Sequence, residues 1–369
     1  MYKIYFLLGI LVLFISSCNQ PSPVTITPSE IILQQSNDVL PISSFAESVD
    51  YLELKLDQVG ISLGEVEAVK QIDDDWIIQH RMSGQRSFIR FNRHGDFIAE
   101  LAGEKMKEII EPEDIIAFDK GYAVLAKNGV HLISKDGKYI RKFVTGNQTI
   151  GSRFLVEEGH FYILNEKLAD RILVEAGDAA RESMKEDVLP LQVQRTMYAN
   201  SQTFSKTQSY FSVLSDSIYR HTANDAENVT KLTGNGIPTF AGIVRNMRGM
   251  EEKDGLKYLR ETNYVMVRKY LENNQLIYLT YWIGSVSSTF ILNKANGTFH
   301  YFGQGVNDID GGIWDRPLFL TSGNDLVIPL TAYKISGHKI SNKKVKGFDR
   351  LQAKIASDGN PVLMLCKLK

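Results

Sequence analysis

The residues of this chain with the clearest chemical potential are grouped near its C-terminal end. Asn307, Asp308 and Asp310 stand directly before Gly311-Gly312 and bring three side-chain oxygen donors into one short loop. Such a loop could hold calcium or hydrogen-bond the hydroxyls of a sugar. Trp314 follows the loop, so its indole could stack on a sugar ring beside the carboxylates.

Trp282, at the end of a predicted strand, is the fifth residue of this expected ligand surface. The alternative is structural: the aspartates would cap a glycine turn, and both indoles would pack between elements. An EF-hand is not predicted, because the twelfth position counted from Asp308 is Phe319 rather than glutamate. No cofactor is predicted, and calcium has only this loop in its favour.

Motifs for catalysis are absent from the sequence. The seven histidines are scattered singly, without H-E-x-x-H or H-x-H spacing, and no G-x-S-x-G or phosphate-binding glycine loop occurs. His94 and His131 lie beside or within predicted turns and are expected at the surface. The acidic clusters at 73–75 and 111–114 are interpreted as solvated turns rather than paired catalytic carboxylates. Histidines or acids gathered from separate segments remain the alternative.

The elements that must position these residues are mostly short strands. Residues 49–56 (VDYLELKL) alternate apolar and polar side chains, as in a half-buried strand, and similar segments recur to the C-terminus. Helical patterns are scarce. Residues 178–188 are a predicted short helical connector, and residues 247–262 a predicted charged surface insertion.

A repeat organises the strands. Residues 88–98 and 130–140 share an apolar strand, a polar turn ending in glycine and an aromatic residue that opens the next strand; their glycines are 42 residues apart. Weaker copies occur at 171–177 and 290–299. Asp-Gly and Asn-Gly turns between apolar strands predict hairpins in which both central residues have positive φ. Four-stranded units at this period are typical of β-propellers.

The repeat predicts an all-β propeller of four-stranded antiparallel blades within a domain at 41–369. The length of this domain, divided by the repeat period, predicts six blades, or seven as the alternative. We expect the strand at 49–56 to pair near 361–368 in the last blade and close the ring, since closure leaves no long edge exposed.

Several stretches resemble the six-bladed β-propeller lipoproteins of the Bacteroidetes, a group related in shape to NHL-repeat propellers. They are residues 42–56, 91–101, 133–143, 216–220, 234–238 and, most specifically, 307–312 (NDIDGG). The resemblance implies the fold and an envelope location, but little chemistry. Residues 103–108 (GEKMKE) depart from the glycine- and proline-rich loop usual there, which puts backbone contacts with a ligand at that loop in doubt.

The N-terminus predicts export. Lys3 precedes a twelve-residue apolar run at 4–15, and small residues lead to Cys18, as in a bacterial lipoprotein signal cleaved before the lipidated cysteine. A transmembrane anchor is the rival, but it needs roughly 20 apolar residues. We expect residues 1–17 to be the signal peptide and residues 18–40 a lipidated tether. Cys366 is the other cysteine, so no internal disulfide is expected.

Charge and composition narrow the partners. The net charge is −1, from 42 basic and 43 acidic residues, which gives no electrostatic footprint for nucleic acid. We expect an outer-membrane lipoprotein, with the periplasmic face favoured over the cell surface, and a monomer. The expected function is non-catalytic binding or scaffolding of a glycan, peptide or protein; the alternative is a carbohydrate hydrolase or lyase with its site at the central channel.

Overall fold

The structure of this 369-residue chain is a computed structural model. It describes residues 28–56, 61–103, 106–143, 216–222, 225–339, 347–355 and 359–369, and the backbone of six strands between 153 and 211. The described part is mostly β. Its helices are the 3-10 turn η1 (Ile42–Ser44) and α3 (Phe240–Asn246), α4 (Glu252–Glu261), α5 (Ala332–Gly337) and α6 (Phe348–Ile355). None of these helices is both long and apolar enough to cross a membrane.

The first three sheets are antiparallel, each with four strands in chain order. The first contains β4 (Glu65–Ile72), β5 (Asp75–Met82), β6 (Gln85–Phe91) and β7 (Phe97–Ala102). The second contains β8 (Pro112–Phe118), β9 (Gly121–Ala126), β10 (Gly129–Ser134) and β11 (Tyr139–Phe143). The third contains β12 (Arg153–Glu157), β13 (His160–Asn165), β14 (Asp170–Val174) and β15 (Ala179–Glu182).

The later sheets include strands from distant parts of the chain. The fourth has β17 (Ser209–Phe211), β18 (Ser217–Thr222) and β19 (Asp225–Gly234), with β1 (Glu30–Leu33) parallel to β19. The fifth has β16 (Gln202–Phe204), β20 (Val265–Glu272), β21 (Leu276–Ile283), β22 (Val286–Asn293) and β23 (Phe299–Phe302). The sixth has β25 (Phe319–Leu320), β26 (Asp325–Leu330), β27 (Val362–Leu368) and β3 (Ala46–Glu53). A two-stranded sheet joins β2 (Val39–Pro41) to β24 (Gln304–Val306).

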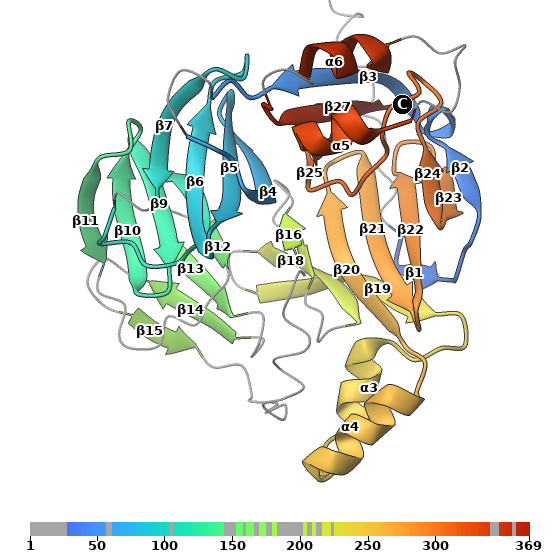
Figure 1. The fold of residues 1–369 in the computed structure, drawn as a ribbon. Coiled ribbons are helices and arrows are strands. Elements are labelled where there is room, and N and C mark those ends of the chain that lie inside the picture. The colour runs from blue at the N-terminus through green and yellow to red at the C-terminus, as the bar shows by residue number, and fades with distance from the viewer. Residues whose placement is uncertain are drawn as a thin grey trace, which may run out of the picture.

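The sheets are arranged around a common centre, with β4, β8, β16 and β25 on the inside and β7, β11, β23 and β3 on the outside (Figure 1). The hydrophobic core lies between neighbouring sheets. One cluster joins the first and second sheets through Phe88 and Ile115, and others join the fourth to the fifth and the fifth to the sixth. A further cluster packs Trp76 and Ile78 of the first sheet against Val327 and Leu363 of the sixth. The last sheet therefore packs against the first.

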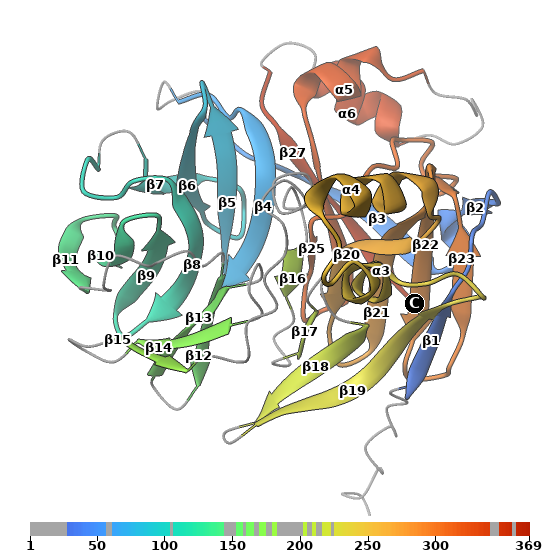
Figure 2. The ribbon, with the colours of Figure 1, turned by 90° about the horizontal axis from the view of Figure 1, so that it is seen from below.

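The N-terminal segment lies along the outer strands. β1 runs beside β19 (Figure 2). Tyr281 and Tyr301 donate hydrogen bonds to the backbone oxygens of residues 34 and 32. β3 pairs antiparallel with β27, from Glu53–Val362 to Ala46–Leu368. The predicted pairing of β3 with the last sheet is confirmed. The tether expected at 18–40 is shorter at its C-terminal end, because residues 28–40 already contact the sheets; residues 18–27 lie outside the described residues.

The repeat turns contain left-handed glycines, as predicted: φ is 79° at Gly95, 79° at Gly137 and 73° at Gly297. The expectation that both central residues have positive φ is wrong. His94 and Asp136 are not left-handed, because these are longer turns in which Gly95 donates to the oxygen of Asn92 and only the glycine must turn back. Gly177, in the third copy, lies outside the described residues.

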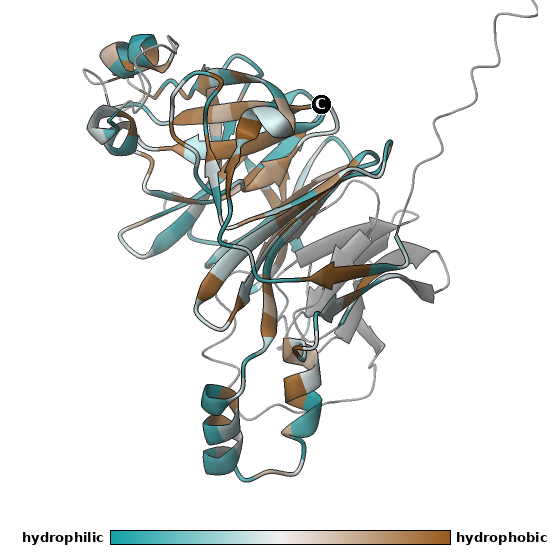
Figure 3. Cartoon of the chain, turned by 90° about the vertical axis from the view of Figure 1, so that its right-hand side faces the viewer, coloured by the Kyte–Doolittle hydropathy of each residue, from teal (hydrophilic) through white to brown (hydrophobic). Residues whose placement is uncertain are grey.

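The two predicted helical segments have different outcomes. The connector predicted at 178–188 is wrong where the structure describes it, because residues 179–182 form β15 and pair with β14. The insertion predicted at 247–262 contains α4, which forms a projecting hairpin with α3 that alternates hydrophilic and hydrophobic residues (Figure 3). α3 precedes the predicted segment, and its residues Phe240, Ile243 and Val244 are buried against the fourth and fifth sheets.

Candidate functional site

The predicted ligand loop at 307–312 uses its oxygen atoms for internal contacts. Asp308 accepts hydrogen bonds from the backbone nitrogen of Ser43, at 2.9 Å, and from its hydroxyl, at 2.5 Å. The Oδ1 atom of Asn307 accepts from the nitrogens of Ile309 and Asp310, at 3.3 Å each. Asp308 therefore ties η1 to the loop, and these side chains have the contacts of a structural turn.

Asp310 lies deeper in the same loop. Its Oδ1 accepts from the nitrogen of Gly312 at 3.0 Å, and burial followed by the charge of Asp310 raises the pKa of the neighbouring Tyr51. The Tyr51 hydroxyl and the Nδ2 of Asn307 have no hydrogen-bond partner in the described structure. No group of three or more His, Cys, Asp or Glu side chains among the described residues is arranged to hold a metal ion.

The two predicted tryptophans have different neighbours. Trp314 is partly buried, edge-on to Phe45 with ring centroids 5.7 Å apart. Trp282 is 42% exposed, and the guanidinium carbon of Arg268 lies 4.9 Å from its ring centroid. The structure thus brings Trp314 to the loop at 307–312, while Trp282 belongs to a different cluster.

A set of residues that the sequence did not indicate lies at bulges in β4, β8 and β20. Glu67 of β4, Glu113 of β8 and Arg268 of β20 each fall between two paired neighbours and have no partner in register. A bulge re-aims the side chain of the extra residue. All three are charged, and all lie near the beginning of their strand.

We name one side of the molecule the bulge face: it is the side on which β4, β8 and β20 begin. It also carries the β5–β6, β9–β10, β21–β22 and β26–β27 connections, because antiparallel strands return to the same side. A contact between sheets joins two of these beginnings. The side-chain amide of Gln79 donates to the oxygens of Pro112 and Glu113, at 3.1 and 3.3 Å, and so joins the first sheet to the beginning of β8.

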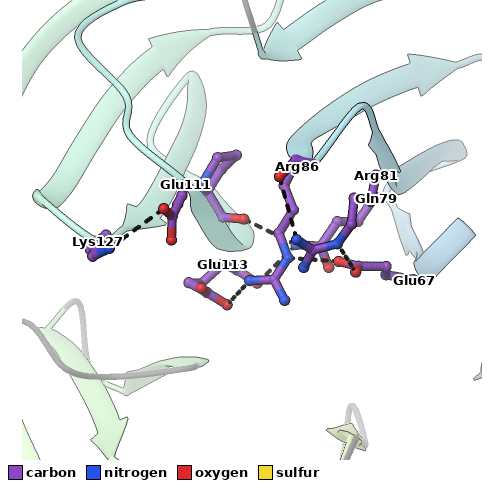
Figure 4. Close-up of polar contacts among 9 residues, drawn as sticks. Glu67, Gln79, Arg81, Arg86, Glu111, Glu113 and Lys127 are labelled. Atoms are coloured by element: carbon purple, nitrogen blue, oxygen red, sulfur yellow. Dashed lines mark hydrogen bonds and ion pairs between the residues drawn. The ribbon is translucent and has the colours of Figure 1, made fainter. Parts of the chain in front are cut away.

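Glu67 and Glu113 are neutralised by two arginines (Figure 4). Glu67 accepts from the Nε of Arg81 at 2.6 Å and from the Nε of Arg86 at 2.7 Å, and a terminal nitrogen of Arg86 lies 2.5 Å from Glu113. Burial raises the pKa of Glu113, while Arg86 opposes the shift. This network links the first and second sheets at the bulge face.

The acidic cluster at 111–114 is therefore not the solvated turn that we expected. Only Glu111 is exposed, 3.4 Å from Lys127. Asp114 is 2% exposed and pairs with Lys70, and Glu113 is half-buried. The partners belong to a neighbouring sheet, so sequence spacing carried no signal for them. At 73–75, Asp73 and Asp74 are exposed as predicted, whereas Asp75 pairs with Arg90.

The histidines also divide into exposed and buried side chains. His94 is exposed as predicted. The expectation for His131 is wrong: it is 0% exposed within β10, and burial lowers its pKa to about 4. His80 is also buried, with its Nε2 2.6 Å from the hydroxyl of Ser87 and its Nδ1 accepting from the nitrogen of Gly64. Because Nδ1 accepts, the neutral ring carries its proton on Nε2 and donates to Ser87.

A pocket of about 900 Å³ opens on the bulge face between the sixth and first sheets. Its apolar wall includes Leu63, Leu318 and Leu330, and its polar groups include Arg316, Thr331 and Asn360. A volume of this order suits a small ligand or a few residues of a peptide.

The exposed hydrophobic side chains are distributed differently on the two sides of the molecule. Five lie on the bulge face, in its connections or in the last turn of a strand: Met82, Ile110, Met250, Trp282 and Tyr333. The other six in the described structure lie on outer strands or β1 and β2: Ile32, Val39, Ile98, Tyr139, Ile140 and Phe299. Tyr139 and Phe299 open their strands directly after turns of the opposite face. None lies in the described turns of the opposite face, where the exposed residues are polar, as at Asp73, Asp74, Asp119 and Lys120.

These features define a mostly β protein with a propeller-like arrangement of sheets and one distinctive face. No protein-family model matches the sequence, and no curated protein matches it significantly. The chain is similar to a solved structure from Bacteroides fragilis described as an exported protein, with a TM-score of 0.69 and 14% identity over 92% of this chain and 99% of that one. This similarity shows a shared fold.

Two further structures are less similar. A Bacteroides thetaiotaomicron protein of unknown function has a TM-score of 0.44 and 9% identity, over 86% of this chain and 76% of that one. The WD40 domain of Neurospora crassa Pan2 has a TM-score of 0.40 and 10% identity, over 87% and 96%. Scores below 0.5 do not establish a shared fold.

Proposed function

We propose that this chain is an exported, lipid-anchored six-bladed β-propeller that binds a protein partner through its bulge face and performs no reaction. The observation that carries the proposal is that the connections of the bulge face carry the exposed hydrophobic side chains Ile110, Met250 and Tyr333, whereas the described turns of the opposite face carry none. Met, Tyr and Trp beside arginines are the composition typical of protein interfaces. A glycan partner has less support, since Trp282 is the one exposed indole among the described tryptophans.

Closure of the ring is part of this proposal. The pairing of β3 with β27 and the core shared by the first and sixth sheets support it, since both join the two ends of the blade series. A closed ring would hold the innermost strands in fixed positions, and with them the residues of the bulge face.

The anchor rests on the sequence, because residues 1–27, including Cys18, lie outside the described residues. We infer attachment to the outer membrane facing the periplasm. Residue 28 lies ten positions after Cys18, which allows a reach of about 35 Å when the chain is fully extended. Cys18→Ser should prevent labelling with a fatty-acid probe, and equal labelling of the variant would remove the anchor from the proposal.

The hydrolase or lyase alternative gains no support from the described site. The Ser87–His80 pair has a serine beside a histidine, but His80 donates to Ser87 and so cannot accept its proton. Glu67 and Glu113 are both paired with Arg86, so their carboxylates are engaged within the molecule.

Affinity capture from the cells that produce the protein tests the proposal. Met82→Glu and Tyr333→Glu place charges on the bulge face and should release a protein captured by the wild type, because a buried unpaired charge opposes association. His94→Glu, an exposed change on the opposite side, is the matched control. Recovery of the same protein by all three variants would refute the proposal, and retention of glycans alone would assign the face to carbohydrate.

A further inference from the structure

The bulge residue of the fifth sheet differs from the other two. Glu67 and Glu113 both pair with Arg86, so their charges are compensated within the molecule. Arg268 has no ion pair with any described residue, and its Nε is buried without a hydrogen-bond partner. A buried, unpaired guanidinium donor is costly, so it points to a group that the chain itself does not provide.

A second arginine lies nearby. Arg316, in the connection leading into β25, is exposed, lacks an ion pair within the described structure and contributes to the pocket between the sixth and first sheets. Burial, and then the positive charge of Arg316, lower the pKa of Arg268. Arg316 therefore lies near enough to Arg268 for the two charges to repel each other, while Asp315, which lines the same pocket, is paired with Lys334.

Trp282 fixes the orientation of Arg268. The guanidinium carbon lies over the indole, 4.9 Å from the ring centroid, and the N–H donors of a guanidinium lie along its edge. An arginine edge matches the planar geometry of a carboxylate, which it can bind through two parallel hydrogen bonds. The pocket beside Arg316 offers apolar walls for the remainder of the ligand.

We propose that Arg268 and Arg316, oriented by Trp282, form a carboxylate-binding site on the bulge face. The inference rests on the proposed function in assigning the carboxylate to an acidic segment of the protein partner. The site itself is defined by the unpaired arginines, and a free carboxylate can probe it without any partner.

Fluorine NMR of the full chain, labelled with 5-fluorotryptophan and purified in a mild detergent, tests the site. The sequence contains three tryptophans, and Trp282→Phe identifies the resonance of residue 282. At constant ionic strength, titration with acetate in place of chloride should shift that resonance saturably. Arg268→Met and Arg316→Gln should each abolish the saturation, whereas Arg93→Gln, in an exposed turn of the opposite side, should retain it.

Each outcome decides the inference. Saturation by acetate that both arginine variants abolish supports it. A shift with sulfate but none with acetate would overturn it in favour of a sulfated ligand, and no saturable shift with either anion would overturn it altogether. Because Arg316 is exposed, its variant provides the test even if Arg268→Met does not fold. Acetate binding with no captured protein would leave the site standing while the proposed function fails.

Discussion

Single glycines determine how neighbouring sheets approach one another. A Cβ at Gly95 would lie 1.9 Å from the backbone oxygen of Glu53, so this left-handed turn also seats the first sheet against β3. Gly84 has a similar φ of 84° but open space around it. Gly255 lies in α4, where an added Cβ would meet the mobile end of Met247 at 3.0 Å.

Alanine substitutions at these three positions should distinguish the cost of backbone strain from the cost of a steric clash with the neighbouring sheet. We expect Gly84→Ala to cost about 1 kcal/mol through backbone strain alone. Gly95→Ala should cost about 2–4 kcal/mol, because the backbone of two sheets must also move apart. Gly255→Ala should be neutral or stabilise by up to about 1 kcal/mol. Urea unfolding measures the series, and equal losses at Gly84 and Gly95 would contradict the packing role of the turn.

His131 should make stability depend on pH. The unfolded side chain titrates near 6.5 and the folded one near 4, so between these values the unfolded state binds more protons. The contribution is complete above pH 6.5 and is lost as pH falls toward 4, by roughly 2–3 kcal/mol. His131→Gln should flatten this part of the curve of unfolding free energy against pH, with His94→Gln as control. An unchanged slope would show that His131 is not held neutral.

At the scale of elements, the loop at 307–312 holds the N-terminal segment in place through the hydrogen bonds between Asp308 and Ser43. Asp308→Ala removes both acceptors of Ser43, which should cost about 1–3 kcal/mol by leaving the backbone nitrogen at the start of η1 without its partner. Thermal melts check this loss, and capture of the partner should be unaffected. Weakened partner binding at unchanged stability would return the loop to the functional site.

Stepwise deletion tests the path of the N-terminal segment. Removal through Thr27 should leave the melting temperature unchanged, because the described contacts begin at residue 28. Removal through Pro41 takes away β1 and β2 and should lower it. Removal through Leu56 exposes the edge of β27 and should cause aggregation, which size-exclusion chromatography detects. A monomer with an unchanged melting temperature after the last deletion would exclude closure by β3.

The strands could be predicted from the sequence where the pattern that defines them lies within a few neighbouring residues. Alternating apolar residues and turn glycines defined the first two sheets, and the strand at 49–56 was placed beside its partner. The contacts of the N-terminal segment could not be predicted, because Ser43 and its acceptor Asp308 are 265 residues apart. The charged bulges were missed for a similar reason: Glu113 reads as part of an acidic turn until Arg86 of another sheet is in place.

At the scale of the whole molecule, the two sides of the propeller-like fold have different surfaces. The turns opposite the bulge face are short and polar, whereas the bulge face carries the helical insertions α3–α4 and α5–α6, the pocket and five exposed hydrophobic side chains. Insertions on one side of a repeated scaffold are typical of a binding surface, because the scaffold fixes the loops without depending on their sequence.

Site-specific photo-cross-linking in intact cells measures this asymmetry most directly. A photoreactive amino acid is placed in turn at Ile110, Trp282 and Tyr333 on the bulge face and at Asp74, His94 and Lys120 on the opposite side. All six side chains are exposed, so each variant should fold. We predict that the first three positions cross-link to one and the same protein and that the last three do not. Cross-links to that protein from the opposite side alone, or equally from both sides, would contradict a binding role for the bulge face.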